Sequence, residues 1–247
     1  MHNTFIATTF DWDHRNPKDW QRFLNRVLRK FRIKAKLTPP QPGMANVEIR
    51  MNLFHLLEQT VVHNVPGDVV ELGCNAGEST IVMRIILNTL ASRKQLHAYD
   101  SFACLPKLQE TDHRDEVYSE GDMAVDDHVL IKNFDSLGLK LPHIHKGWFE
   151  DTIPEELPEQ ICFALIDCDL YEGTKHVLPH VYERMPAGAI GMIAVYYDEK
   201  LLPRKGLEGG YRSPGVKRAV DEFFADKPET VGMLYANENA CGYFRKL

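Results

Sequence analysis

The chain has 247 residues and a mass of 28.3 kDa, and its content of 44% hydrophobic and 26% charged residues excludes a disordered chain, a collagen-like chain and a disulfide-stabilised miniprotein. Its net charge of −6 is unevenly distributed, with +8 on residues 15–36 and −12 on residues 37–247, which argues against a nucleic-acid-binding protein as a whole. No stretch approaches the ~20 apolar residues that span a bilayer, no secretory signal is recognisable, and five scattered cysteines form no C-x-x-C pair, so we expect a cytoplasmic protein without membrane contact.

Residues 16–33 form the first predicted element, an amphipathic helix that starts at Asn16 and Pro17. Its apolar stripe follows the helical period through Trp20, Phe23, Leu24, Val27, Leu28 and Phe31. We expect the stripe to pack on the core and the basic face to lie in solvent. A lid over an active site, a dimer contact and a membrane-surface helix are the alternatives. A proline-rich break at residues 38–43 then marks residues 1–43 as an N-terminal extension of a domain formed by residues 44–247.

From residue 44 onward, predicted helices and strands alternate. The predicted helices are residues 44–63, 79–91, 125–137, 174–185 and 213–224, and the predicted strands are residues 68–72, 95–99, 142–145, 161–166, 189–195, 230–235 and 242–245. Thr174 is a candidate N-cap for one helix, and Ser213 followed by Pro214 for another. Such alternation predicts an α/β fold with a mostly parallel sheet covered on both faces, in which ligands bind beyond the carboxyl ends of the strands.

A glycine-containing turn follows the first predicted strand. Gly73 and Gly77 permit a tight turn, Asn75 tolerates a left-handed conformation, and the next helix would present its amide groups to a ligand. Glu71 stands where a dehydrogenase would receive a pyrophosphate, so its negative charge favours a cationic ligand group. The alternative is a purely structural strand-to-helix turn, which accounts for the glycines better than for the acid.

Two further strand ends carry groups suited to a nucleoside. Asp100 ends the second strand, where a carboxylate can accept hydrogen bonds from both ribose hydroxyls. Its alternative role is to cap a turn that begins at Ser101. After the third strand, Trp148 and Phe149 could sandwich an adenine ring, although such a pair is more often part of a core.

The fourth strand ends in two carboxylates, Asp167 and Asp169, after a wholly apolar run that packing alone does not explain. One could hold a divalent cation while the other acts as a general base. The fifth strand is followed by Asp198, another candidate ligand. The sequence has no zinc-ligand spacing, no G-x-S-x-G and no G-x-G-x-x-G, so zinc hydrolases, serine esterases and dinucleotide oxidoreductases lack support.

At these residues the sequence resembles class I S-adenosylmethionine methyltransferases of the macrocin O-methyltransferase (TylF-type) family. The resemblance runs from about Val65 to the C-terminus and rests on five ordered motifs: residues 66–77, 100–106, 147–152, 167–174 and 214–223. It implies a Rossmann-like fold with a seven-stranded sheet, S-adenosylmethionine bound over the first strand ends, and often magnesium beside the acceptor hydroxyl.

Carried over by position, the resemblance assigns roles to individual residues. Those implied to bind the methyl donor are Glu71, Gly73, Asn75, Gly77, Ser79, Asp100, Ser101, Trp148, Phe149 and Asp167. Asp169 would be the general base, and Asp167 with Asp198 the magnesium ligands. The chain departs from the family at the end of the fifth strand, where Tyr196 and Tyr197 occupy the positions of the usual aspartate pair.

The resemblance implies methyl transfer to a hydroxyl of a sugar or other small natural-product-like molecule. We expect residues 1–43, 103–124 and 200–212 to determine the acceptor, with the last segment closing over it. Two alternatives stay open. One is a metal-independent N-methyltransferase, consistent with the missing aspartate pair, and the other is a non-catalytic donor-binding partner protein. The exposed basic helix also leaves a homodimer open.

Overall fold

A computed structural model describes residues 19–31, 45, 47–112, 118–196, 213–234 and 240–247. Within these residues, none of the helices has both the length and the apolar character that crossing a membrane requires. The expected proline-rich break, the closing segment at residues 200–212 and the candidate metal ligand Asp198 lie outside the described residues.

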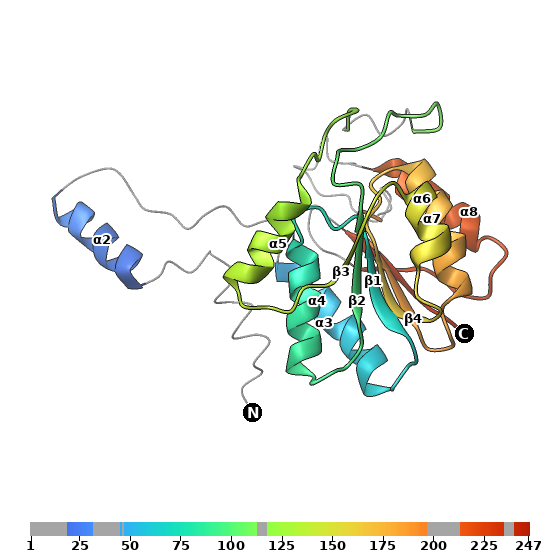
Figure 1. The fold of residues 1–247 in the computed structure, drawn as a ribbon, viewed down its shortest axis with the longest axis horizontal. Coiled ribbons are helices and arrows are strands. Elements are labelled where there is room, and N and C mark those ends of the chain that lie inside the picture. The colour runs from blue at the N-terminus through green and yellow to red at the C-terminus, as the bar shows by residue number, and fades with distance from the viewer. Residues whose placement is uncertain (1–18, 32–44, 46, 113–117, 197–212, 235–239) are drawn as a thin grey trace.

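Seven strands form one sheet at the centre of the molecule (Figure 1). They are β1 (Asp68–Leu72), β2 (Leu96–Asp100), β3 (His143–Lys146), β4 (Ile161–Ile166), β5 (Ile190–Ile193), β6 (Gly232–Leu234) and β7 (Cys241–Arg245). Their order in the sheet is β3-β2-β1-β4-β5-β7-β6, and β7 runs antiparallel to both of its neighbours while the other pairs are parallel. The predicted seven-stranded, mostly parallel sheet is therefore confirmed.

Helices cover both faces of this sheet. On one face lie α3 (Val47–Val62), α4 (Glu78–Thr89) and α5 (Asp127–Ser136), and on the other lie α6 (Phe149–Glu156), α7 (Tyr171–Glu183) and α8 (Pro214–Phe224) (Figure 1). Every residue of β4 is buried, as expected for a central parallel strand with helices on both sides. The sheet and its helices hold the strand ends in fixed positions, which allows loops there to build a site.

The first helix differs from its prediction. α2 (Asp19–Lys30) forms as a helix, but its apolar stripe does not join the core: Trp20 is 55% exposed, Phe23 61% and Phe31 70%. In Figure 1 it stands apart from the sheet and the other helices. The expectation that this stripe packs on the core of the same chain is thus wrong.

Three local predictions also need correction. Residues 149–156 were not expected to be helical, yet α6 forms there and includes Pro154. α7 begins at Tyr171 rather than beyond Thr174, so the Thr174 hydroxyl donates within the helix to the carbonyl of Leu170 instead of capping it. Ser213 does precede α8, but its hydroxyl makes no capping bond.

Candidate functional site

A pocket opens at the carboxyl ends of the parallel strands, where β1 and β4 lie side by side. The chain leaves β1 for one face of the sheet and β4 for the other, which is the topological switch point at which α/β proteins bind ligands. Backbone bonds prolong the sheet past the strand ends: the Asp167 amide donates to the Leu72 carbonyl at 2.8 Å, and the Gly73 amide to the Tyr99 carbonyl at 2.9 Å. These bonds hold the three turns that line the pocket in register.

The turn after β1 requires glycine where the sequence provides it. Gly73 has a φ of +92°, and a Cβ atom there would lie 2.0 Å from the Asp167 carbonyl oxygen. Asn75 adopts the expected left-handed conformation, with φ of 44°, and its side-chain amide donates to the Met123 carbonyl at 3.0 Å. The turn thus brings bare backbone to the pocket wall, and a ligand can approach it closely.

Glu71 does not lie in the pocket. Its side chain is fully buried beneath the turn, where its carboxylate accepts hydrogen bonds from the hydroxyls of Ser79 and Thr80 at the start of α4. Burial raises the pKa of Glu71 from 4.5 to about 7, more than the two hydroxyls lower it. Glu71 therefore connects β1 to the start of α4, and its contact with a cationic ligand stays a prediction. Gly77 likewise lies outside the lining and packs against Leu130.

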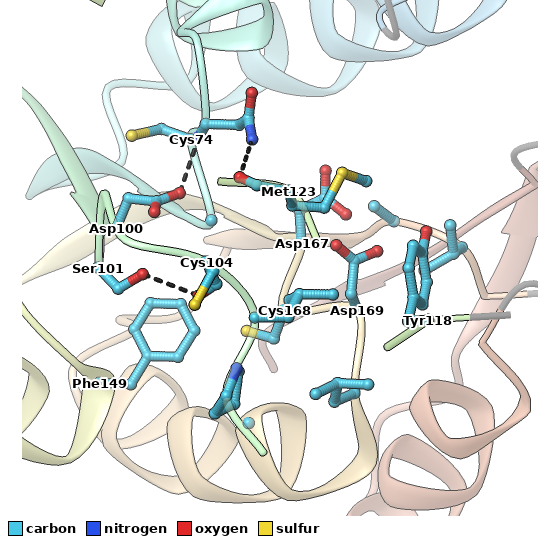
Figure 2. A pocket seen from close by; sticks show the side chains of 18 of the residues that line it. Cys74, Asp100, Ser101, Cys104, Tyr118, Met123, Phe149, Asp167, Cys168 and Asp169 are labelled. Carbon is cyan, nitrogen blue, oxygen red and sulfur yellow. Dashed lines mark hydrogen bonds between the residues drawn. The ribbon is translucent and has the colours of Figure 1, made fainter. Parts of the chain in front are cut away.

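Asp100, at the end of β2, holds two loops and also faces the pocket. One carboxylate oxygen accepts from the Asn75 amide at 2.8 Å (Figure 2). The other accepts from the Phe102 amide, also at 2.8 Å. The alternative prediction, that Asp100 caps the turn that begins at Ser101, is therefore confirmed in part by the bond from the Phe102 amide. Each carboxylate oxygen can accept more than one hydrogen bond, so Asp100 keeps capacity for ligand hydroxyls. Ser101 lines the pocket beside it.

Trp148 and Phe149 line the pocket from the start of α6. Trp148 is 39% exposed, and Phe149 packs partly against the core. An exposed indole and a half-buried ring at a pocket edge are suited to stacking on a flat heterocycle. Stacking on adenine stays a prediction.

The two aspartates after β4 both line the pocket (Figure 2). Asp169 has a φ of 59°, a left-handed conformation that is uncommon outside glycine and found more often at functional sites. Burial, together with the neighbouring Asp169 charge, raises the pKa of Asp167 well above its usual range. This pair therefore places two carboxyl groups side by side at the pocket wall, and each disfavours the ionisation of the other.

The end of β5 gives this site no oxygen ligand among the described residues. Ala194 and Val195 line the pocket, but the Tyr196 hydroxyl donates to Asp221 of α8 at 2.9 Å. The described residues do contain one cluster of potential ligands, Asp126, Asp127 and His128, but none of the three lines the pocket. Of the two predicted magnesium ligands, Asp167 lines the pocket and Asp198 lies outside the described residues, so the magnesium site stays a prediction.

A segment that crosses from β2 toward α7 forms another wall of the pocket. We call its described parts, residues 104–112 and 118–122, the strap. Its base is closed by the Leu105 amide, which donates to the Asp122 carbonyl at 2.8 Å. Farther along, the buried Asp112 accepts from the Glu172 amide at the start of α7 at 3.2 Å. Arg218 of α8 completes the attachment by donating to the Thr111 carbonyl while it stacks over the Tyr171 ring.

The strap brings residues to the site that sequence reasoning did not single out. Gln109, Asp112 and Tyr118 line the pocket from the strap, and Glu172 lines it from α7. The segment was expected to influence ligand choice, but a carboxylate in a loop gives no sign that it will be buried against a distant helix. Ala45 and Cys241 complete the lining from the start of α3 and from β7, which no motif indicated.

The pocket lining is strongly acidic. Among the described residues, the lining contains seven acidic side chains and one basic one, Lys107; the acidic ones are Glu78, Asp100, Asp112, Glu150, Asp167, Asp169 and Glu172. Clefts lined by one sign of charge concentrate ligands of the opposite sign. The lining therefore favours a ligand that carries positive charge and hydroxyl groups over an anionic one.

The sequence matches known proteins of one group. A family model described as Macrocin-O-methyltransferase (TylF) matches residues 11–202. The mycinamicin III 3''-O-methyltransferase of Micromonospora griseorubida is 32% identical over 169 residues, which are 63% of this chain and 66% of that relative. The 8-demethyl-8-(2,3-dimethoxy-alpha-L-rhamnosyl)-tetracenomycin-C 4'-O-methyltransferase of Streptomyces olivaceus is 31% identical over 153 residues, 59% of each chain. The chain thus spans about two thirds or less of the length of these relatives.

Solved structures share the architecture. The structure of the O-methyltransferase NovP overlays with a TM-score of 0.71 at 22% identity, and the overlay covers 98% of this chain and 95% of the NovP chain. The calicheamicin methyltransferase CalS11 overlays with a TM-score of 0.61 at 18% identity, covering 93% and 94%. At these identities the likeness concerns the fold alone, and it confirms the predicted Rossmann-like methyltransferase architecture.

Proposed function

The chain belongs to the macrocin O-methyltransferase (TylF) family, and from this premise we propose that it transfers a methyl group from S-adenosylmethionine to a hydroxyl of a small molecule, of the sugar or natural-product type. The observation that carries the proposal is that Asp169, the Gly73 turn and Asp100 line one pocket. The family resemblance stated from the motifs is thereby confirmed, whereas the role of each residue is part of the proposal.

The donor end of the pocket fits S-adenosylmethionine in three respects. The Gly73 turn brings backbone without a side chain to the pocket wall, Asp100 can accept hydrogen bonds from ribose hydroxyls, and Trp148 with Phe149 offers rings for the adenine. The acidic lining suits the positive charges of the sulfonium and amino groups. When bound, this donor supplies an activated methyl group.

Asp169 would perform the proton transfer. An alcohol is almost wholly un-ionised at neutral pH, so its proton must leave as its oxygen attacks the methyl carbon. Burial and the neighbouring Asp169 charge raise the pKa of Asp167, and we assign the proton acceptor to Asp169, the position that the family resemblance gives to the general base. The remaining contribution is positional, because holding the acceptor oxygen in line with the methyl group and its sulfur removes much of the entropic barrier.

The strap would form the acceptor wall. Gln109, Tyr118 and Glu172 line the same pocket as Asp169, and their polar groups can bind the several hydroxyls of a sugar. The named activities of the two relatives, both O-methyltransferases of glycosylated natural products, support a sugar hydroxyl as the acceptor.

The test is the Asp169→Asn variant, compared with Asp135→Asn on the exposed surface of α5. We expect turnover of Asp169→Asn to fall by about 100-fold to 10,000-fold, the usual contribution of a general base. Release of S-adenosylhomocysteine is measured with a panel of glycosides that carry free hydroxyls, and donor binding by calorimetry. Binding should be unchanged in both variants. Undiminished turnover in Asp169→Asn would remove this residue from the mechanism.

A second candidate, methyl transfer without a metal ion, is favoured by Tyr196. Its hydroxyl faces Asp221 rather than the pocket, so the position of a usual magnesium ligand is otherwise occupied. A metal-free site suits an amine acceptor as well as an alcohol, because an amine is the better nucleophile. Activity that survives a chelator supports this candidate. Activity that is lost with the chelator and restored by magnesium supports a metal site completed by Asp198.

A further inference from the structure

α2 presents apolar residues that the rest of the described chain leaves uncovered. Trp20, Phe23 and Phe31 are more than half exposed, and Leu24 is 39% exposed. By contrast, each of the other described helices contributes buried residues to the apolar cores, for example Leu53 from α3, Leu130 from α5 and Ile153 from α6. An isolated helix of this length is marginal in water, so α2 requires a surface that covers its stripe.

The charge around α2 narrows the choice of that surface. Residues 15–36 carry +8, and Arg26 and Lys30 are exposed on the helix itself. A surface that receives this helix should combine exposed apolar side chains with acidic ones, because opposite charges steer and orient association. Residues 37–247 carry −12, so the body of this same protein has the required sign.

One part of the body combines both properties. Residues 120–141, which we call the acidic flank, include the exposed lysines Lys132 and Lys140 but more exposed carboxylates, namely Glu120, Asp122, Asp126 and Asp135. The same stretch of sequence contains exposed apolar side chains: Val129 is 39% exposed, Leu137 42% and Leu141 37%. Exposed large apolar residues with a polar rim are typical of interaction surfaces.

We propose that α2 of one copy docks on the acidic flank of a second copy, so that the protein is a homodimer in which two copies exchange their N-terminal helices. A single chain leaves the stripe of α2 exposed, whereas reciprocal exchange covers it in both copies and repeats one contact by two-fold symmetry. The 13 residues between Phe31 and Ala45 can extend to about 45 Å, enough to reach a neighbouring copy.

Exchange would place the partner helix near the pocket. Met123 belongs to the acidic flank and also lines the pocket, and Ala45, where the connection from α2 ends, lines it as well. The dimer would therefore bring the second copy close to the pocket entrance, but self-association itself does not depend on the proposed methyltransferase activity.

The test is the mass of the full-length chain in solution, measured by sedimentation velocity over a range of concentrations. We expect a dimer for the unaltered protein. Phe23→Glu should raise its dissociation constant at least 100-fold, because a carboxylate would enter the apolar contact. Val62→Glu is the matched control, since Val62 is also 61% exposed but lies on α3. Circular dichroism checks that each variant is folded.

A second variant tests the receiving surface. Glu120→Lys with Asp135→Lys should also weaken the dimer, and high salt should weaken the unaltered dimer. An equimolar mixture of this variant with Phe23→Glu keeps one intact contact of the two, so it should form more dimer than either variant alone.

Three results would overturn the proposal. If Phe23→Glu leaves the dissociation constant of the dimer unchanged, the apolar stripe of α2 is not in the contact. If Phe23→Glu weakens the dimer but the flank variant does not, the two copies of α2 contact each other instead of the acidic flank. A monomer at all concentrations shows that no second copy covers α2. In that case, binding of the monomer to vesicles that contain anionic lipid would identify a membrane surface as its partner.

Discussion

Glu71 shows which features of a residue's surroundings the sequence reveals and which it does not. Its position at the end of β1 was predictable, because an apolar strand precedes it and a glycine turn follows. Its burial was not, because the hydroxyls of Ser79 and Thr80 that accommodate the carboxylate come from the next helix. A carboxylate near a strand end can thus stabilise the turn by accepting hydrogen bonds from the first residues of the next helix.

The raised pKa of Glu71 makes stability depend on pH. Because the folded protein binds this proton more tightly than the unfolded chain, the associated stability is complete below pH 4.5 and is lost as pH rises through about 7. Glu71→Gln removes the ionisation. The free energy of unfolding, measured with urea, should therefore fall less between pH 5 and pH 8 for Glu71→Gln than for the unaltered chain, by up to about 3 kcal/mol. The exposed Glu155→Gln is the control, and equal losses in all three proteins would contradict the prediction.

Backbone conformation at the pocket was predictable only for some residue types. Asn75 and Gly73 favour positive φ, and both adopt it. Val195 also has a φ of 48°, although a β-branched residue disfavours this region. β5 consequently ends at Ile193, two residues earlier than predicted, and no propensity could have revealed it.

At the scale of elements, the attachment of the strap to α7 explains why this helix begins earlier than the sequence predicted. Thr174 was the expected cap, but α7 starts three residues earlier because Asp112, sixty residues upstream, accepts the Glu172 amide. The same carboxylate also accepts the Gln109 amide at 3.0 Å, so it fixes the local turn and the helix together. Elements with a clear hydrophobic period were predicted, whereas α6, short and interrupted by Pro154, was missed.

Detaching the strap from α7 should weaken acceptor binding and leave donor binding unchanged. Asp112→Ala removes a helix cap and should cost about 1 kcal/mol of stability, and it should raise the KM for the acceptor while the affinity for S-adenosylhomocysteine stays unchanged. Arg218→Ala should have the same effects, because it removes the guanidinium that donates to the Thr111 carbonyl. The measurements are urea unfolding, steady-state kinetics and calorimetry.

Asp122→Ala provides the control for the strap. The Asp122 carboxylate accepts from the Ser119 amide, which lies within the strap, so this variant perturbs the strap at a bond that does not attach it to α7. If Asp122→Ala and Asp112→Ala raise the acceptor KM equally, attachment to α7 is not what positions the wall. A loss of donor affinity in Asp112→Ala would show that the two ends of the pocket are not independent.

At the scale of the whole molecule, ligand binding should be visible as stability. S-adenosylhomocysteine at 100 times its Kd should stabilise the fold by about 2.7 kcal/mol, which is a rise in Tm of several degrees for a chain of this size. Thermal melts with adenosine alone provide the comparison. The absence of any shift with S-adenosylhomocysteine would remove the basis for a donor site at the ends of β1 and β2.

The order of the strands has a consequence for how the chain acquires its structure. β1 pairs with β2 across 27 positions at Val70 and His97, but with β4 across 94 positions at Val70 and Ala164. Closing the longer loop costs more chain entropy and slows folding. We therefore expect β1, β2 and β3 to assemble early, leaving the far edge of β1 open until β4 arrives. During that interval the open edge can pair with another chain, so the yield of refolded protein should fall as its concentration rises.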